Sequence, residues 1–295
     1  MLLIPFIQRG LMMKKRVLLS DVANLAGLSK ATVSRYMNHS IVLPQATVTR
    51  IESAIAELDY RGNSLARRLS KGGSETLGLV LSDITNPFFA ELADAAEEAA
   101  FENGYSLVLC ITRNNPEKES QFIHWLDTCQ VDGLLFATNR PDNGSLRKEI
   151  QRHQRIVLLD EDIPGSCAPK VFADNEQGGR LATEQLIAAG HREIAFIGGP
   201  DALMSVRERY QGFCTALAQA GLSCPPEWVM YGDYRREFGQ RALHQLFSRP
   251  QRPTAVFAAS DFLVLGLLDG LRDFGLRAPQ AVSLVGFDDA SDADF

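Results

Sequence analysis

Polar and aromatic side chains follow several short apolar runs of the chain between residues 76 and 295. They stand at four run ends: Ser82–Phe89, Asp160–Glu161, Ser260–Asp261 and Asp288–Asp289. Carboxylate and amide oxygens can accept hydrogen bonds from sugar hydroxyls, and an aromatic face can stack on the apolar side of a sugar ring. If these ends converge, they form a pocket for a small hydroxylated solute. Asp also caps helices in such positions, and we expect Asp261 to act only as an N-cap.

A second group of chemically informative residues opens an expected helix near the N-terminus. Ser29 is expected to cap this helix, which begins with Lys30, Ala31 and Thr32, and Arg35 follows one turn later. At the start of a helix in the DNA major groove, Arg can bond bidentately to guanine, and a Thr or Ala methyl can contact the thymine methyl. The alternative is that Lys30 and Arg35 are merely solvated charges on a small helical domain.

The elements around these residues favour the first interpretation. Ser20 is expected to cap a helix over residues 21–26, and Gly27 supplies the backbone freedom for a tight turn before Ser29. A third helix is predicted because apolar residues recur at Val48, Ile51, Ile55 and Leu58, on one face of a 3.6-residue period. Three short helices joined through a Gly turn predict a helix-turn-helix module, whose second helix lies in a major groove.

Charge is divided unequally along the 295-residue chain. Residues 1–71 hold 11 Lys and Arg against 4 Asp and Glu, a net charge of +7, whereas residues 72–295 hold 19 against 32, or −13. A basic head before an acidic body predicts a polyanion-binding module joined to a domain with another task.

The cysteine spacing and the lack of catalytic motifs argue against a disulfide-stabilised fold, a metal site and catalysis. Five cysteines without a C-x-x-C pair favour neither a disulfide framework nor a zinc site, and they fit a reducing cytoplasm. No G-x-S-x-G, Walker or H-E-x-x-H motif occurs, and the five histidines are not paired as ligands would be. We therefore expect no catalytic residue, no metal and no cofactor.

The body alternates apolar runs with helical patterns. Strands are expected at Leu77–Leu81, Ser106–Ile111, Gly133–Ala137, Ile156–Leu159, Ile194–Ile197, Ala255–Ala258 and Ser283–Phe287. Helices are expected at Phe88–Glu102, Lys118–Cys129, Gln177–Ala189, Val206–Ala220, Phe238–Phe247 and Asp261–Phe274. Repeated β-α units predict parallel sheets with helices on both faces, and two such sheets leave a cleft as the natural pocket.

The head resembles the DNA-binding domain of the LacI/GalR family of bacterial transcription regulators. The resemblance rests on LSDVANLAGLSKATVSRYMN (19–38), AELDY (56–60) and NSLARRL (63–69). It implies that Ser29, Lys30, Ala31, Thr32, Ser34 and Arg35 contact operator DNA. It also implies a hinge helix that wedges into the minor groove through Asn63, Ala66 and Leu69. Gly62 stands where the family commonly has Pro, which loosens the entry to that helix.

The body is similar to the effector-binding core of the same family, through NPFF, LLDED, S-x-R-x-R-x-x-G-F, ASD and GFDD in that order. The resemblance implies an effector pocket formed by Asn86, Phe88, Phe89, Asp160, Arg209, Tyr234, Ser260 and Asp288. Arg209 is expected to be its hub; the alternative is an ion pair with a neighbouring carboxylate such as Glu208. Ser260 stands where many relatives have Asn, so the polar side chain at this position is shorter.

The two ends of the chain depart from a typical pattern. Met1–Ile7 is too short for a signal peptide and precedes its charge, so we expect translation to start at Met12 or Met13. No stretch is long enough for a membrane span. The chain ends at Phe295, just after GFDD, and we expect C-terminal elements of the family core to be missing. The expected organisation is an extension (1–17), a helix-turn-helix domain (18–62), a hinge helix and linker (63–75), and a core (76–295) with lobes at about 76–173 and 174–290.

The fold class expected is therefore an all-α helix-turn-helix head plus an α/β two-lobed core like a periplasmic binding protein. The function expected is a cytoplasmic, homodimeric repressor of a palindromic operator, controlled by a small sugar or sugar derivative. A purine- or nucleoside-responsive regulator stays open, because Phe88 and Phe89 could stack on a base. A sugar-binding transport or receptor component is disfavoured by the basic head.

Overall fold

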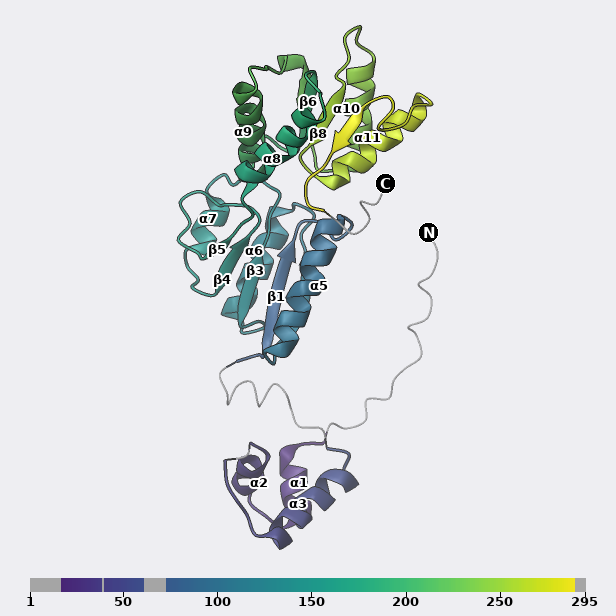
Figure 1. Ribbon diagram of the computed structural model, residues 1–295. Coiled ribbons are helices and arrows are strands. Elements are labelled where there is room, and N and C mark those ends of the chain that lie inside the picture. The colour runs from purple at the N-terminus through teal and green to yellow at the C-terminus, as the bar shows by residue number, and fades with distance from the viewer. Residues whose placement is uncertain (1–16, 39, 61–72, 290–295) are drawn as a thin grey trace. The chain divides into compact units, whose positions relative to one another are not determined.

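The computed structural model describes residues 17–38, 40–60 and 73–289, and it divides between Ser74 and Glu75 into two compact units. Each unit is described by itself below (Figure 1). The implied hinge residues Asn63, Ala66 and Leu69 lie outside the described residues. Among the helices of the described ranges, none has both the length and the apolar content that a bilayer crossing requires.

The N-terminal unit contains the three predicted helices. They are α1 (Leu19–Ala26), α2 (Lys30–Met37) and α3 (Gln45–Glu57). Their shared core consists of small and branched apolar side chains at helical spacing, with Val22, Val33 and Ile51 fully buried and Leu28 and Met37 packed at its margin. This shared core confirms the three-helix module expected from the sequence.

The ends of α1 and α2 differ in how far the sequence predicted them. Ser20 lies inside α1, so its expected role as N-cap is wrong; the carboxylate of Asp21 instead accepts the backbone N–H of Leu18 at 2.8 Å. Gly27 ends α1 in the left-handed region (φ 64°), as expected. Ser29 caps α2 as expected, its hydroxyl accepting the Thr32 N–H at 3.1 Å.

The first sheet of the C-terminal unit is parallel throughout. Its strands are β1 (Thr76–Leu81), β2 (Ser106–Ile111), β3 (Gly133–Phe136), β4 (Ile156–Leu159) and β5 (Lys170–Val171), in the spatial order β2-β1-β3-β4-β5. Alternate residues of β1 face opposite sides of the sheet. Leu79 and Leu81 pack with Phe89 of α5 (Pro87–Glu102), whereas Val80 faces a cluster that includes α6 (Pro116–Asp127) and α7 (Ser145–Ile150).

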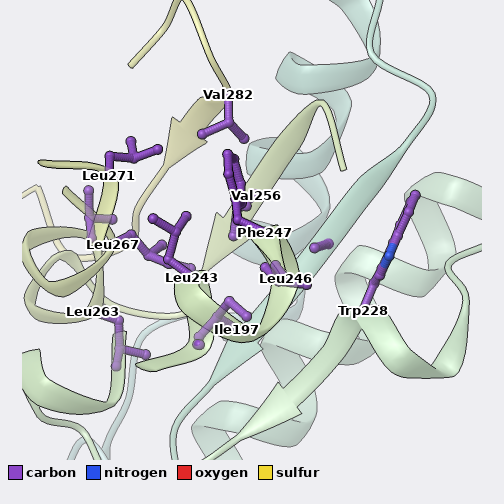
Figure 2. Packing of buried hydrophobic residues seen from close by; sticks show 14 of the residues in the cluster. Ile197, Trp228, Leu243, Leu246, Phe247, Val256, Leu263, Leu267, Leu271 and Val282 are labelled. Carbon is purple, nitrogen blue, oxygen red and sulfur yellow. The ribbon is translucent and has the colours of Figure 1, made fainter. Parts of the chain in front are cut away.

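The second sheet repeats this construction with four parallel strands. They are β6 (Ile194–Gly198), β7 (Val229–Tyr231), β8 (Ala255–Ala258) and β9 (Ser283–Val285), in the order β7-β6-β8-β9. One face packs against α8 (Asn175–Ala188) and α9 (Met204–Gln219), and the other against α10 (Arg236–Phe247) and α11 (Asp261–Asp273). Figure 2 shows the second face, where Leu243, Val256 and Leu267 gather between the helices and the sheet.

Three elements were not predicted from the sequence. They are α7, the two-residue β5, and β7, which follows a short 3₁₀ turn at Pro226–Trp228. Each is too short for a hydrophobic period to recur several times, so the sequence pattern does not reveal it. The expected final strand also ends early, at Val285 rather than Phe287.

The close crossing of α8 and α9 positions the residues that lie between the two sheets. A Cβ at Gly179 of α8 would lie 2.3 Å from the carbonyl oxygen of Arg209 in α9, and one at Gly212 would lie 2.1 Å from the carbonyl oxygen of Glu176. Only glycine permits this approach of the two backbones. Gly179 and Gly212 therefore allow the two helices to pack closely, and this packing fixes where Arg209 enters the cleft.

Candidate functional site

The first candidate site is the exposed side of α2. Lys30, Ala31 and Arg35 are exposed, while Val33 points into the core with no exposed surface. Thr32 and Ser34 are half-buried between these two sides. The hydroxyls of Ser29 and Thr32 lie 2.8 Å apart, within hydrogen-bond distance. The predicted DNA-contacting residues of α2 therefore include one solvent-facing cation in each of its two turns.

Contacts from α3 fix the orientation of α2 and of the turn before it. The hydroxyl of Tyr36 donates a hydrogen bond to Glu52 at 2.9 Å. Arg50 donates to the carbonyl oxygens of Ala26 and, at 3.1 Å, Gly27, which are left without helical partners at the end of α1. These hydrogen bonds from α3 hold the turn and α2 in place, and so they fix the direction in which the cationic side of α2 faces.

The second candidate site lies where the carboxyl ends of the two sheets face each other. Strand order reverses between β1 and β3 in one sheet and between β6 and β8 in the other, the positions at which such sheets bind ligands. A cavity of about 20 Å³ lies there. It is lined by all eight residues expected for the effector pocket, Asn86, Phe88, Phe89, Asp160, Arg209, Tyr234, Ser260 and Asp288, together with Asn139 and Ser205.

Arg209 is the central cation of this cavity and is only 4% exposed. Its Nε donates to the Asn175 side chain at 2.8 Å and its Nη1 donates to the Ala259 carbonyl. The guanidinium lies 3.7 Å from the centroid of the Phe287 ring, and its Nη1 lies 3.7 Å from a carboxylate oxygen of Asp288. The proposed alternative partner, Glu208, instead accepts from Asn175 at 3.4 Å, so the Glu208 ion pair was wrong.

Carboxyl groups from both halves of the unit surround this one guanidinium. Burial raises the pKa of Asp288 to about 7, and Arg209 only partly offsets this. Burial likewise raises the pKa of Asp160, again opposed by Arg209. One cation does not compensate several buried carboxylates, so the cluster holds protons close to neutral pH.

Glu161, next to Asp160, joins the two halves of the unit. It is 2% exposed, and it accepts hydrogen bonds from the hydroxyl of Ser205 and from the backbone N–H of Met204 at 2.9 Å, in the first turn of α9. Burial raises the pKa of Glu161 to about 7, while the hydrogen bonds from Ser205 lower it.

Two of the cavity residues also shape helix starts. Asn86 accepts the Phe88 N–H at 3.1 Å and caps α5. Ser260 accepts the Phe262 N–H at 3.1 Å and caps α11. The cap of α11 is therefore Ser260, and the role expected for Asp261 was wrong because α11 begins one residue earlier than a cap at Asp261 requires.

A larger pocket of about 440 Å³ adjoins the cavity and shares Asn139 and Tyr234 with it. Its other lining residues are Ser82, Asp83, Thr85, Arg113, Asn114, Pro200, Asp233, Arg235, Glu237 and Phe262. The Tyr234 ring packs over Gly199, where a Cβ would lie 2.4 Å from it. We call the two spaces the inner cavity and the outer pocket.

Both units match one protein family, in the order in which they occur along the chain. Residues 18–63 match the bacterial regulatory proteins of the lacI family. Residues 74–294 match the family of periplasmic binding proteins and the sugar binding domain of the LacI family. The chain belongs to the LacI family.

Relatives in the LacI family align over most of this chain. The ribose operon repressor of Escherichia coli (strain K12) is 36% identical, and the HTH-type transcriptional repressor PurR of Vibrio vulnificus (strain CMCP6) is 34% identical. Each alignment covers 94% of this chain, with 84% and 83% of the relative, respectively. A crystal structure of the lac repressor dimer bound to operator and the anti-inducer ONPF has a TM-score of 0.81 at 28% identity, covering 94% of this chain and 84% of that one.

Sequence reasoning missed three polar residues of this LacI-family core that lie at or beside the inner cavity, Asn139, Asn175 and Ser205, and it named Glu161 only as a strand-end carboxylate. Asn139 follows β3 as Asp160 follows β4, and this position was the signal that could have found it. Asn175, Glu161 and Ser205 act through Arg209 or the α9 terminus, and only the packing of the two sheets brings them together.

Proposed function

We propose that this LacI-family protein is a DNA-binding transcriptional repressor whose operator affinity is set by a small effector bound between its two sheets. The observation that carries the proposal is the combination, on one chain, of a helix-turn-helix unit with an exposed cationic side on α2 and a core whose strand ends converge on a buried polar cavity. The role is regulatory rather than catalytic.

Contacts with DNA are assigned to α2 and to the segment that follows α3. We assign Arg35 and Lys30 to base edges and phosphates in the major groove, with Ser29, Ala31, Thr32 and Ser34 as neighbouring contacts. Asn63, Ala66 and Leu69 are assigned to the minor groove. A homodimer on two half-sites requires a near-palindromic operator.

An apolar strip on the core supports a homodimer. The edge strand β2 exposes 37% of Val108 and 48% of Leu109, and Phe101 at the end of α5 is 75% exposed. Apolar residues gathered on an edge strand and its adjacent helix mark a surface that another chain covers. We propose that the partner copy of the homodimer covers this strip. We also propose that the dimer acts in the cytoplasm.

The effector is assigned to the sugars or their derivatives. Carboxylates and amides of the inner cavity match sugar hydroxyls, with Arg209 as the central donor. The purine alternative depends on two stacking rings, but Phe89 is 1% exposed within the hydrophobic core, which leaves Phe88 as the only available face of the pair. Effector binding must change operator affinity by the same factor by which operator binding changes effector affinity.

The test is selection of duplexes from a random-sequence pool, followed by binding titrations by fluorescence anisotropy. Wild-type protein should enrich a near-palindrome, and its affinity should fall steeply as salt rises because counterions return to the phosphates. Arg35→Ala should enrich no sequence, while Arg249→Ala, an exposed arginine of the core, should behave as wild type. Failure of the wild type to prefer any selected duplex over scrambled DNA would overturn the proposal.

A further inference from the structure

We propose that the effector has two hydroxyl-rich rings, one in the inner cavity and one in the outer pocket, as in a disaccharide. The inference rests on the proposed function, because it takes the effector to be a sugar. It concerns residues at the ends of β1 and β2 and the segment before α10, and the sequence did not single out Arg113, Asn114, Asp233 or Arg235.

The two spaces have very different sizes. The inner cavity of about 20 Å³ holds about one water-sized group, whereas the outer pocket of about 440 Å³ falls within the range of pockets for small ligands. They share Asn139 and Tyr234, so a ligand that parts the inner side chains continues directly into the outer space. A single ring leaves one of these two polar spaces unfilled.

A buried hydroxyl without a hydrogen-bond partner points to a ligand in the outer pocket. Ser82, at the carboxyl end of β1, is 1% exposed, and its hydroxyl has no hydrogen-bond partner within the described chain. The buried hydroxyl of Tyr234, at the boundary between the two spaces, lies beside the Ser205 side chain, its hydrogen-bonding neighbour. Buried hydroxyls are normally satisfied, so Ser82 marks a position where a ligand oxygen would gain a hydrogen bond.

The charges around the outer pocket favour a neutral polyol over an anion. Arg113 and Arg235 line the pocket, and within the described residues neither forms an ion pair. Three carboxylates, those of Asp83, Asp233 and Glu237, also line it and outnumber the two arginines. Donors and acceptors of both charge signs beside the rings of Tyr234 and Phe262 match sugar hydroxyls and the apolar face of a pyranose.

The test is isothermal titration calorimetry of the full-length protein with a defined panel. The panel is D-ribose, D-glucose and D-galactose; cellobiose, maltose and lactose; glucose 6-phosphate; and hypoxanthine. Variants are Ser82→Ala and Arg235→Ala in the outer pocket, with Arg249→Ala as the control on the same half of the core as Arg235. Operator binding of each protein is measured in parallel, so that loss of the regulator and loss of the second ring are distinguished.

The expected result is a disaccharide that binds at least about tenfold more tightly than either of its monosaccharides. Ser82→Ala and Arg235→Ala should each weaken that disaccharide several-fold, while Arg249→Ala should not. Ser82→Ala should melt no lower than wild type without ligand, because the oxygen it removes has no partner in the protein.

Three results would overturn the two-ring effector while leaving the repressor itself intact. One is a monosaccharide that binds as tightly as every disaccharide and is insensitive to both outer-pocket variants. Another is preferential binding of glucose 6-phosphate that depends on Arg235, which would make the outer pocket an anion site. A third is operator binding without affinity for any disaccharide in the panel. If hypoxanthine were the only compound of the panel to bind, this would instead contradict the proposal that the effector is a sugar.

Discussion

Replacing Glu161 with Gln tests whether a buried proton helps to hold the two halves of the core together. The side chain follows β4 and accepts hydrogen bonds from the first turn of α9. Glutamine keeps an oxygen that can accept the Met204 N–H but has no titratable proton. The variant therefore separates the hydrogen bonds of Glu161 from its ionisation.

The sign of the pH effect follows from the direction of the pKa shift. Burial raises the pKa of Glu161 to about 7, above its ordinary 4.5, so between these values the folded core holds a proton that the unfolded chain has released. Stability from this group is complete below pH 4.5 and is lost as pH rises towards 7. From pH 5.5 to 7 the loss is about 2 kcal/mol, at about 1.4 kcal/mol per pH unit.

The assay is thermal unfolding of wild type and Glu161→Gln between pH 5.5 and 8. Relative to wild type, the Tm of the variant should rise by about 4 to 8 °C across this interval, since 1 kcal/mol shifts a domain of this size by about 2 to 4 °C. Glu98→Gln, at an exposed position of α5, should keep the wild-type pH dependence. Parallel Tm profiles for wild type and Glu161→Gln would refute the inference that Glu161 carries a proton in the folded core near neutral pH.

Two further substitutions test the packing that presents each site. Gly179→Ala should lower the melting temperature of the core and weaken effector binding, because its Cβ would lie 2.3 Å from the Arg209 carbonyl oxygen; a stability equal to wild type would contradict this close crossing. Arg50→Ala should destabilise the head by about 1 to 3 kcal/mol, measured by circular dichroism, since the carbonyls of Ala26 and Gly27 lose their donor. Arg50→Lys should restore part of that loss, whereas an unchanged Arg50→Ala melt would show that water satisfies these carbonyls equally well.

The head was predictable from sequence because its signals are local. Ser29 caps α2 and Gly27 turns the chain through contacts with their immediate neighbours, and the third helix displays its apolar period over several turns. Ser20 shows the limit of this reasoning. Its residue type suits a cap, but Asp21 accepts the Leu18 N–H, and the helix begins earlier.

The core site was predictable only in part. Its strand-end residues could be found because parallel strands bring their carboxyl ends together, and all eight expected residues do line the inner cavity. Whether they bind the effector stays a prediction. The inter-sheet hydrogen bonds of Glu161 and the unpartnered hydroxyl of Ser82 have no local pattern, because they depend on how two separately formed sheets meet.

The backbone at the inner cavity indicates that its carboxylates are held in place by the tertiary structure. Asp160 (φ 66°) and Asp288 (φ 108°) both have positive φ, which costs an Asp less than most residues but is still unfavourable. Both lie next to Arg209, whose own orientation is fixed by Asn175 and by the Ala259 carbonyl. Such conformations persist only where surrounding packing imposes them, and neither Asp has a role in capping a described helix. A ligand that offers hydroxyl donors to these carboxylates would stabilise their charged forms, so effector binding at neutral pH should release protons from the cluster.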